Sequence, residues 1–231
     1  MTANLPNGVI FDLDGTLVDS AADVAAILNK VLAEHQQALF SISEVKIMMG
    51  HGIRATIEKA LKARGRHFDA GVLDRLELEF ARLHEKTPLT GTTPYPHAVK
   101  VLSALREHGV AVGVCTNKSE AAARLVLAGT GLGDHVAALI AGDSGYGMKP
   151  NPEPLQACAK KLGIPLGNIV YVGDHAVDVA TARAAAVPVI IAEYGYGGMK
   201  LRALGADGAI GCLSELSATL AKITPGYRLC P

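Results

Sequence analysis

Six short apolar segments recur along the chain, separated by longer helical patterns. The segments are rich in Val and Ile, and most of them end at glycine or polar residues, which is typical of strands buried on both faces. They lie at 9–11, 110–115, 136–141, 168–173, 187–192 and 208–213, and helical periodicity fills 97–108, 119–129, 153–163 and 176–185. Strands alternating with helices predict an α/β fold, a doubly wound parallel sheet with right-handed crossovers.

One long stretch interrupts this alternation. Between about Asp19 and Pro88 we find no convincing strand, and helical periodicity occupies 21–35, 43–48, 52–64 and 71–86. The flanking segments "VDS" and "PLTGTTPYP" are typical of linkers or hinges. We therefore expect two domains: an α/β core made of residues 1–19 and 89–231, and a smaller all-helical insertion of residues 20–88.

Composition narrows the classes of partner. Lys plus Arg number 22 and Asp plus Glu number 22, there is no Trp, and no basic stripe occurs, so we expect no nucleic-acid partner. No apolar run reaches the length of a membrane span, and the N-terminal segment "MTANLPNG" lacks the regions of a signal peptide. The four cysteines are scattered, which favours free thiols in a reducing cytosol. We expect a cytoplasmic protein without a membrane partner.

Polar residues follow four of the predicted strands. Because ligands bind at the carboxyl ends of strands in open α/β sheets, these side chains are expected to converge. The residues concerned are Asp12, Asp14, Thr116, Asn117, Lys118, Lys149, Asp174, His175 and Asp178. Carboxylates held this close together favour a divalent cation among them.

The four segments that carry these residues resemble the motifs of the haloacid dehalogenase-like superfamily. They are "DLDGTLVDS", "TNKS", "KPNPEPL" and "GDHAVD", in this order. Each alone has a simpler explanation: a turn, a helix cap, a solvated loop, or an N-cap with a first-turn acid. All four together, each after a predicted strand, favour the family. The resemblance implies a Rossmann-like core with a C1-type cap formed by the helical insertion.

The resemblance also implies phosphoryl-transfer chemistry. Asp12 matches the nucleophile that forms an aspartyl-phosphate, and Asp14 matches the general acid and base. Gly15 is expected to allow the backbone to approach the phosphate closely. Thr116 matches the hydroxyl that binds phosphate oxygens, and Asn117 lies beside it among the expected substrate-binding groups.

The same motifs imply Mg²⁺ as cofactor. Asp12 and Asp174 match side-chain ligands, and Asp14 matches a ligand through its backbone carbonyl. Asp178 matches the second acid of the fourth motif, which holds metal-bound water or Lys149 in place. Lys149 matches the cation that stabilises the nucleophile and the transferring phosphoryl group.

Within the insertion, "MMGHGIRATIEKAL" resembles the cap segment of phosphoglycolate phosphatases. We expect Gly50, His51, Gly52 and Arg54 to contact a small anionic substrate. The alternative for Arg54 is an ordinary solvated helix residue. His175 stands where many relatives have Ser, and we expect a local variant without a catalytic duty; the alternative is contact with metal-bound water or substrate. His84 is expected to be an ordinary surface or packing residue.

The expected function is a Mg²⁺-dependent phosphomonoester hydrolase that acts on a small phosphate ester, with 2-phosphoglycolate as the leading substrate. Alternatives within the superfamily are a phosphatase for sugar phosphates or amino-sugar acid phosphates, a nucleotidase or pyrophosphatase, and a phosphohexomutase. The alternative from another class is a catalytically silent regulatory module. We expect a monomer or a homodimer.

Overall fold

The sheet predicted from the apolar segments is present. The computed structural model describes residues 5–35, 37–65, 69–87, 89–197 and 203–223. Its six parallel strands have the order β5-β4-β1-β6-β7-β8. Their bounds are β1 Gly8–Phe11, β4 Ala111–Cys115, β5 Ala138–Ile140, β6 Ile169–Gly173, β7 Val189–Ala192 and β8 Gly208–Ile210. The doubly wound α/β fold is thereby confirmed.

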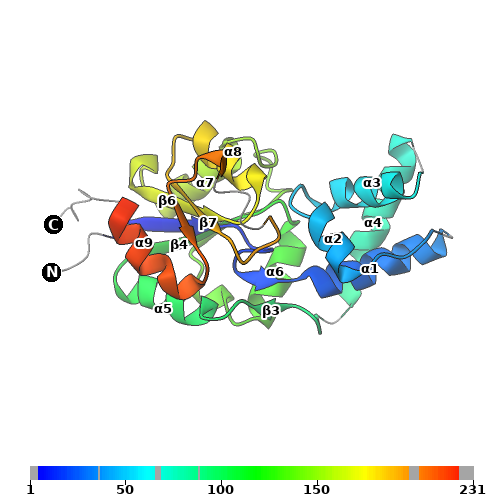
Figure 1. Cartoon of the computed structure of the whole chain (residues 1–231), viewed down its shortest axis with the longest axis horizontal. Coiled ribbons are helices and arrows are strands. Elements are labelled where there is room, and N and C mark those ends of the chain that lie inside the picture. The colour runs from blue at the N-terminus through cyan, green and yellow to red at the C-terminus, as the bar shows by residue number, and fades with distance from the viewer. Residues whose placement is uncertain (1–4, 36, 66–68, 88, 198–202, 224–231) are drawn as a thin grey trace.

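Helices cover both faces of the sheet, as Figure 1 shows. One face packs on α5 (Ala98–Glu107), α6 (Glu120–Gly129) and α9 (Leu216–Ile223), and the other on α7 (Glu153–Leu162) and α8 (Ala176–Ala184). Side chains alternate between the two cores along each strand: Val9 and Phe11 enter the first core, and Ile10 enters the second. Both faces are buried, which explains why the strands are apolar at nearly every position.

Four further helices gather at the other end of the molecule (Figure 1). They are α1 (Ala21–Glu34), α2 (Ile42–Met48), α3 (Ile53–Ala63) and α4 (Ala70–Lys86). They share an apolar core of their own, in which Leu28, Ile57 and Leu76 are fully buried. Local signals define their starts, since Ser41 and Glu44 form a capping box at α2 and Asp69 caps α4. Part of the predicted break in "GRHFDAG" lies outside the described residues.

A short pair of strands, which the sequence pattern did not predict, connects the sheet part of the molecule to helices α1–α4. Strands β2 (Val18–Asp19) and β3 (Thr93–Pro94) pair antiparallel, so the two linkers run side by side. Asp23 ties them further, because its carboxylate accepts hydrogen bonds from Gly91 N at 2.9 Å and from the Thr92 hydroxyl at 2.6 Å. Two-residue strands carry no recognisable periodicity. Helix α9 was also not predicted.

The cysteines and the helices were used above to predict where the protein is located. Cys115 and Cys158 are buried free thiols, and Cys212 is a partly buried one. Cys230 and the tail 224–231 lie outside the described residues. Within the described ranges, no helix is both long enough and apolar enough to cross a membrane.

Candidate active site

Strand order brings the polar residues of separate motifs to one edge of the sheet. β1 lies between β4 and β6, so Asp12, Thr116 and Asp174, which follow these three strands, end side by side. Lys149 arrives from the loop between β5 and α7, and Asp178 lies in the first turn of α8. The chain changes direction across the sheet at β1, which is where open α/β sheets bind ligands.

Three buried carboxylates meet at this edge. One oxygen from each of Asp12, Asp174 and Asp178 lies within 4.8 Å of the others. Lys149 Nζ lies 2.9 Å from Asp12 Oδ1 and 2.7 Å from Asp178 Oδ1. Three carboxylates against one ammonium leave about two negative charges uncompensated in a buried site.

The uncompensated charge appears in the acid–base properties of the cluster. Burial raises the pKa of Asp12 to about 7, although Lys149 opposes the shift. Burial also raises the pKa of Asp174 well above its ordinary value, and the charges of Asp178 and Asp12 add to the increase. A divalent cation would balance the excess charge, so the donor set of buried carboxylate oxygens fits such an ion. The Asp14 side chain, in contrast, does not belong to this cluster of three.

Asp178 is held by the protein through both carboxylate oxygens. Its Oδ2 accepts hydrogen bonds from Asp174 N at 3.1 Å and His175 N at 2.9 Å. Its Oδ1 contacts Lys149 Nζ and lies 3.0 Å from the Tyr171 hydroxyl. With its lone pairs used in this way, Asp178 is better suited to positioning Lys149 than to direct metal ligation.

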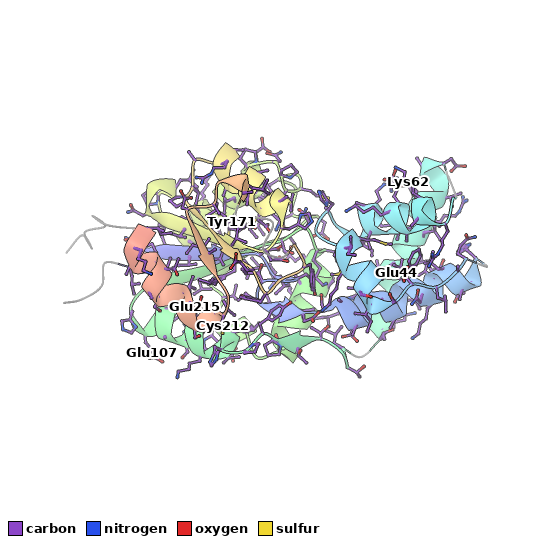
Figure 2. All side chains as sticks on the ribbon, in the orientation of Figure 1. Glu44, Lys62, Glu107, Tyr171, Cys212 and Glu215 are labelled. Carbon is purple, nitrogen blue, oxygen red and sulfur yellow. The ribbon has the colours of Figure 1, made fainter. Side chains whose placement is uncertain are left out.

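Tyr171 is a site residue that the sequence reasoning missed. It lies on β6 and is fully buried, and Figure 2 labels it within the sheet. Its hydroxyl lies 3.0 Å from Lys149 Nζ and 3.1 Å from the Cys115 carbonyl oxygen. A tyrosine in a strand buried on both faces needs a hydrogen-bond partner, and that requirement was the available signal.

Asp14 lies apart from the cluster, on the side that faces helices α1–α4, here called the helical part. Its two oxygens lie 3.1 and 3.0 Å from Lys118 Nζ, and the Ser20 hydroxyl donates a hydrogen bond to Oδ1. The Lys118 side chain is only 9% exposed. The sequence places Lys118 after a strand but indicates no role for it, and its position directly after Thr116 and Asn117 is the available signal.

Thr116 and Asn117 differ in what their side chains contact. Thr116 Oγ1 accepts a hydrogen bond from Lys118 N at 3.2 Å. The Asn117 amide donates to the Lys149 carbonyl at 3.1 Å and to the Gly50 carbonyl at 3.2 Å, and it accepts from Lys149 N at 2.8 Å. Asn117 thus braces the Lys149 loop against the helical part.

Gly15 has a steric reason to lack a side chain. Its φ is +86°, and a Cβ built there would lie 2.2 Å from Asp174 Oδ2. Asp174 is fixed from the other side by the Thr16 hydroxyl at 3.1 Å and by Tyr196 N at 2.7 Å. Glycine therefore keeps the turn after β1 in contact with the Asp174 carboxylate.

Gly15→Ala should consequently displace Asp174. We expect the affinity for a divalent cation to fall at least about tenfold. Residues that hold metal ligands in position typically change metal affinity about 10- to 100-fold when they are substituted. Calorimetric titration with a divalent cation, with thermal unfolding as a check on folding, measures the effect. Gly65→Ala is the matched control, because Gly65 also has positive φ, at +69°, and nothing lies within 4 Å of its Cβ position. Equal metal affinity in the two variants would contradict the steric argument.

The 50–52 loop of the helical part contacts the sheet part. Its Gly50 carbonyl accepts the Asn117 bond, and a Cβ on Gly52 would lie 2.4 Å from Met148 Cε. The His51 and His175 rings meet edge to face with centroids 5.0 Å apart. His175 also caps α8 through its side chain, which accepts from Val177 N. The structure thus provides a structural role for His175.

Arg54 points elsewhere. Its guanidinium pairs with Asp74 and Glu77 of α4, at 2.5 and 3.1 Å. Among the described residues, neither Arg54 nor His51 lines the cavity beside Asp14, whereas Gly50 and Gly52 do. Contact between Arg54 and substrate stays a prediction that this arrangement does not favour.

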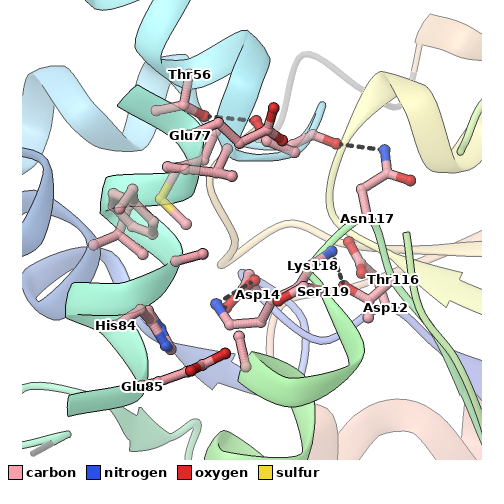
Figure 3. Close-up of a pocket in the computed structure, with 18 residues that line it drawn as sticks. Asp12, Asp14, Thr56, Glu77, His84, Glu85, Thr116, Asn117, Lys118 and Ser119 are labelled. Carbon is pink, nitrogen blue, oxygen red and sulfur yellow. Dashed lines mark hydrogen bonds and ion pairs between the residues drawn. The ribbon is translucent and has the colours of Figure 1, made fainter. Parts of the chain in front are cut away.

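A cavity of about 150 Å³ lies between helices α1–α4 and the carboxyl edge of the sheet (Figure 3). It is lined by Asp12, Asp14, Val24, Met49, Gly50, Gly52, Ile53, Thr56, Glu77, Phe80, Ala81, His84, Glu85, Thr116, Asn117, Lys118, Ser119 and Ala122. Pockets for drug-sized ligands measure roughly 300–1,000 Å³, so the size favours a small metabolite.

Comparison with known proteins identifies the relatives of this chain. Residues 9–192 match the family described as haloacid dehalogenase-like hydrolase. A phosphoglycolate phosphatase from Rhodospirillum rubrum is 40% identical over 227 residues, which cover 96% of this chain and 94% of the relative. A phosphoglycolate phosphatase from Cereibacter sphaeroides (strain ATCC 17029) is 42% identical over 189 residues, or 82% and 86% of the two chains.

Solved structures share the fold. A predicted phosphoglycolate phosphatase from Haemophilus somnus 129PT superposes with a TM-score of 0.83 at 24% identity, covering 91% of this chain and 96% of that one. CbbY from Rhodobacter sphaeroides, solved in complex with phosphate, superposes with a TM-score of 0.75 at 18% identity over 94% and 99% of the two chains. At these identities the likeness concerns the fold alone.

Proposed function

The chain belongs to the haloacid dehalogenase-like hydrolase family, and from this premise we propose that it hydrolyses 2-phosphoglycolate to glycolate and phosphate. The observation that carries the phosphatase chemistry is that Asp12 and Asp14 line one small cavity, with Lys149 2.9 Å from Asp12. The substrate assignment is supported by the phosphoglycolate phosphatases at 40% and 42% identity. The small size of the cavity agrees with this substrate.

In the proposed mechanism, an Asp12 carboxylate oxygen attacks phosphorus as the bond to the ester oxygen breaks. Asp14 gives its proton to the leaving alkoxide, which departs as glycolate. Asp14 then takes a proton from water, the water oxygen attacks the aspartyl-phosphate, and inorganic phosphate leaves with Asp12 restored. The Lys149 ammonium offsets the charge on Asp12 and the phosphoryl oxygens, and the Thr116 hydroxyl donates to one of those oxygens.

We propose Mg²⁺ as the cofactor, with Asp12 and Asp174 as carboxylate ligands. Asp14 would contribute its backbone carbonyl, and Asp178 would act by holding Lys149. The bound ion would neutralise the repulsion between the carboxylate nucleophile and the phosphate. The uncompensated charge of the cluster supports a divalent ion, and oxygen donors of this kind suit Mg²⁺.

We also propose that residues 20–88 act as a cap on a core made of residues 1–19 and 89–231. Support comes from the separate apolar core of α1–α4 and from the cavity between those helices and Asp14. A closed cap would exclude water from the phosphoryl group. The proposal further includes a cytoplasmic location, a small-molecule substrate, no nucleic-acid or membrane partner, and a monomer or homodimer.

A substrate panel tests the proposal. Phosphate release should be measured with 2-phosphoglycolate, sugar phosphates, amino-sugar acid phosphates, nucleoside monophosphates and pyrophosphate, each with Mg²⁺ and with EDTA. We expect kcat/KM for 2-phosphoglycolate to exceed the others by at least about tenfold, and EDTA to abolish turnover. A sugar phosphate in first place would replace the substrate and keep the mechanism. Inactivity on every compound would point to a bisphosphate-activated mutase or to a regulatory module.

A further inference from the structure

The cavity has a phosphate end and a leaving-group end. Asp12 and Thr116 mark the first, and Asp14 marks the point where the ester oxygen must lie if Asp14 protonates it. In 2-phosphoglycolate a single methylene separates that oxygen from the carboxylate. The carboxylate must therefore lie beside Asp14, within reach of whatever side chains surround it.

Lys118 is the cation at this position. Within the part of the chain that the structure describes, it is the one Lys or Arg that lines the cavity, and its Nζ lies 3.0 Å from Asp14 Oδ2. An ammonium has three donors, and the two Asp14 oxygens engage at most two of them. Lys118 can thus hold Asp14 and a second anionic group at the same time.

His84 faces the same space from the helical part. Figure 3 shows it on α4, across the cavity from Lys118. The residue is only 3% exposed, and its Nδ1 has no hydrogen-bond partner. Burial lowers the pKa of His84 to about 4, and the Lys118 charge contributes, so the ring is neutral at pH 7. A buried polar atom without a partner is unfavourable, and a hydrogen bond to a bound ligand atom would remove that cost.

We propose that Lys118 and His84 together bind the carboxylate of the leaving group, and so make the enzyme selective for phosphate esters that carry a carboxylate next to the ester carbon. The inference rests on the proposed 2-phosphoglycolate activity. Lys118 supplies the charge, and the His84 ring donates one hydrogen bond from Nδ1–H. The site is complete only when the helical part and the sheet part are together, because each contributes one residue.

The acidic residues of the cavity restrict where a carboxylate can lie. Glu77 is paired with Arg54, so that carboxylate already has a counter-charge. Glu85 also lines the cavity and disfavours an anion near it. The Lys118 and His84 side chains are therefore the groups at the leaving-group end that favour a carboxylate.

The test compares 2-phosphoglycolate with ethyl phosphate, which has a similar ester but no carboxylate. Four variants are assayed beside the wild type: Lys118→Met, His84→Phe, His84→Asn and Lys62→Met. Lys62 is the matched lysine control, since it is exposed and pairs with Glu58 on α3. The readout is the ratio of kcat/KM for the two substrates, because a variant that merely disturbs Asp14 slows both and leaves the ratio unchanged. Thermal unfolding checks that each variant folds.

We expect a wild-type ratio well above ten. Lys118→Met should lower it about 30- to 100-fold and His84→Phe about tenfold, as hydrogen bonds to a charged group of this kind imply. His84→Asn should keep the ratio within about threefold of wild type, because the amide nitrogen replaces Nδ1. Lys62→Met should leave it unchanged.

Two results would overturn the inference, and they are distinguishable. A high wild-type ratio that stays the same in Lys118→Met and His84→Phe would remove these residues from carboxylate recognition while the proposed function stands. A wild-type protein that releases no phosphate from 2-phosphoglycolate would instead refute the proposed function, and with it this inference, before any variant is considered.

Discussion

Asp12→Asn should release phosphate at least about 10⁴-fold more slowly than the wild type while keeping the fold, as losses of a nucleophile in other enzymes suggest. The amide is a poor nucleophile, but its oxygen can still accept the hydrogen bond from Leu13 N, which the carboxylate accepts at 2.7 Å. Phosphate release with 2-phosphoglycolate and thermal unfolding measure the two effects.

Asp134→Asn is the matched control for this variant, because Asp134 is exposed and precedes β5, at the amino ends of the strands and so opposite the edge where the cluster lies. It should retain wild-type turnover. If a well-folded Asp12→Asn protein kept more than about 1% of the activity, Asp12 would not be the nucleophile and the mechanism proposed above would be wrong.

Of the substitutions proposed here, Lys149→Met should lower the free energy of unfolding the most. The substitution removes the ammonium between Asp12 and Asp178 and leaves buried carboxylates without their cation. Breaking a buried ion pair from one side typically costs about 3–5 kcal/mol in the free energy of unfolding. Urea unfolding in EDTA at pH 8 measures the loss. Lys160→Met, on the exposed side of α7, is the control and should lose little.

The loss of stability in Lys149→Met should depend on pH in a defined direction. Burial already raises the pKa of Asp12 to about 7 in the presence of Lys149, and removing the positive charge raises it further. A carboxyl group whose pKa is higher in the folded than in the unfolded state stabilises the fold while protonated and loses that contribution as pH rises. The deficit of Lys149→Met relative to wild type should therefore grow from pH 5.5 to pH 8. A deficit below about 1 kcal/mol, or one equal at both pH values, would contradict this account.

Much of the fold follows from local patterns. The segment 168–173 is apolar at nearly every position because β6 is buried on both faces, and the period of 3.6 residues in 71–86 corresponds to α4. Predicted bounds differ from the observed ones by at most three residues, as is usual at helix and strand ends. The β2/β3 pair carried no such pattern, because two residues are too few to show a period.

The candidate site could be anticipated in part. Asp12, Thr116 and Asp174 each follow a strand, and neighbouring parallel strands end at the same edge, so their proximity could be inferred once the strands were recognised. The partners of individual side chains could not. Arg54 appeared suited to an anionic substrate, yet it pairs with Asp74 and Glu77 across two helices. Tyr171 had only an indirect signal, a hydroxyl in a strand buried on both faces, and nothing local distinguishes His84 from a packing residue.

The sequence by itself determined the six strands of the sheet, the helices other than α9, the helical insertion, the family and the residues that end at the carboxyl edge of the sheet. These depend on periodicity and on short motifs, which are local properties of the chain. Only the tertiary structure decided that Asp178 is engaged with Lys149 and Tyr171, that Lys118 pairs with Asp14, and that the unpartnered Nδ1 of His84 belongs to a residue lining the same cavity. Such contacts join residues far apart in the chain, and they depend on how the helices of the insertion pack against the sheet, which no local pattern encodes.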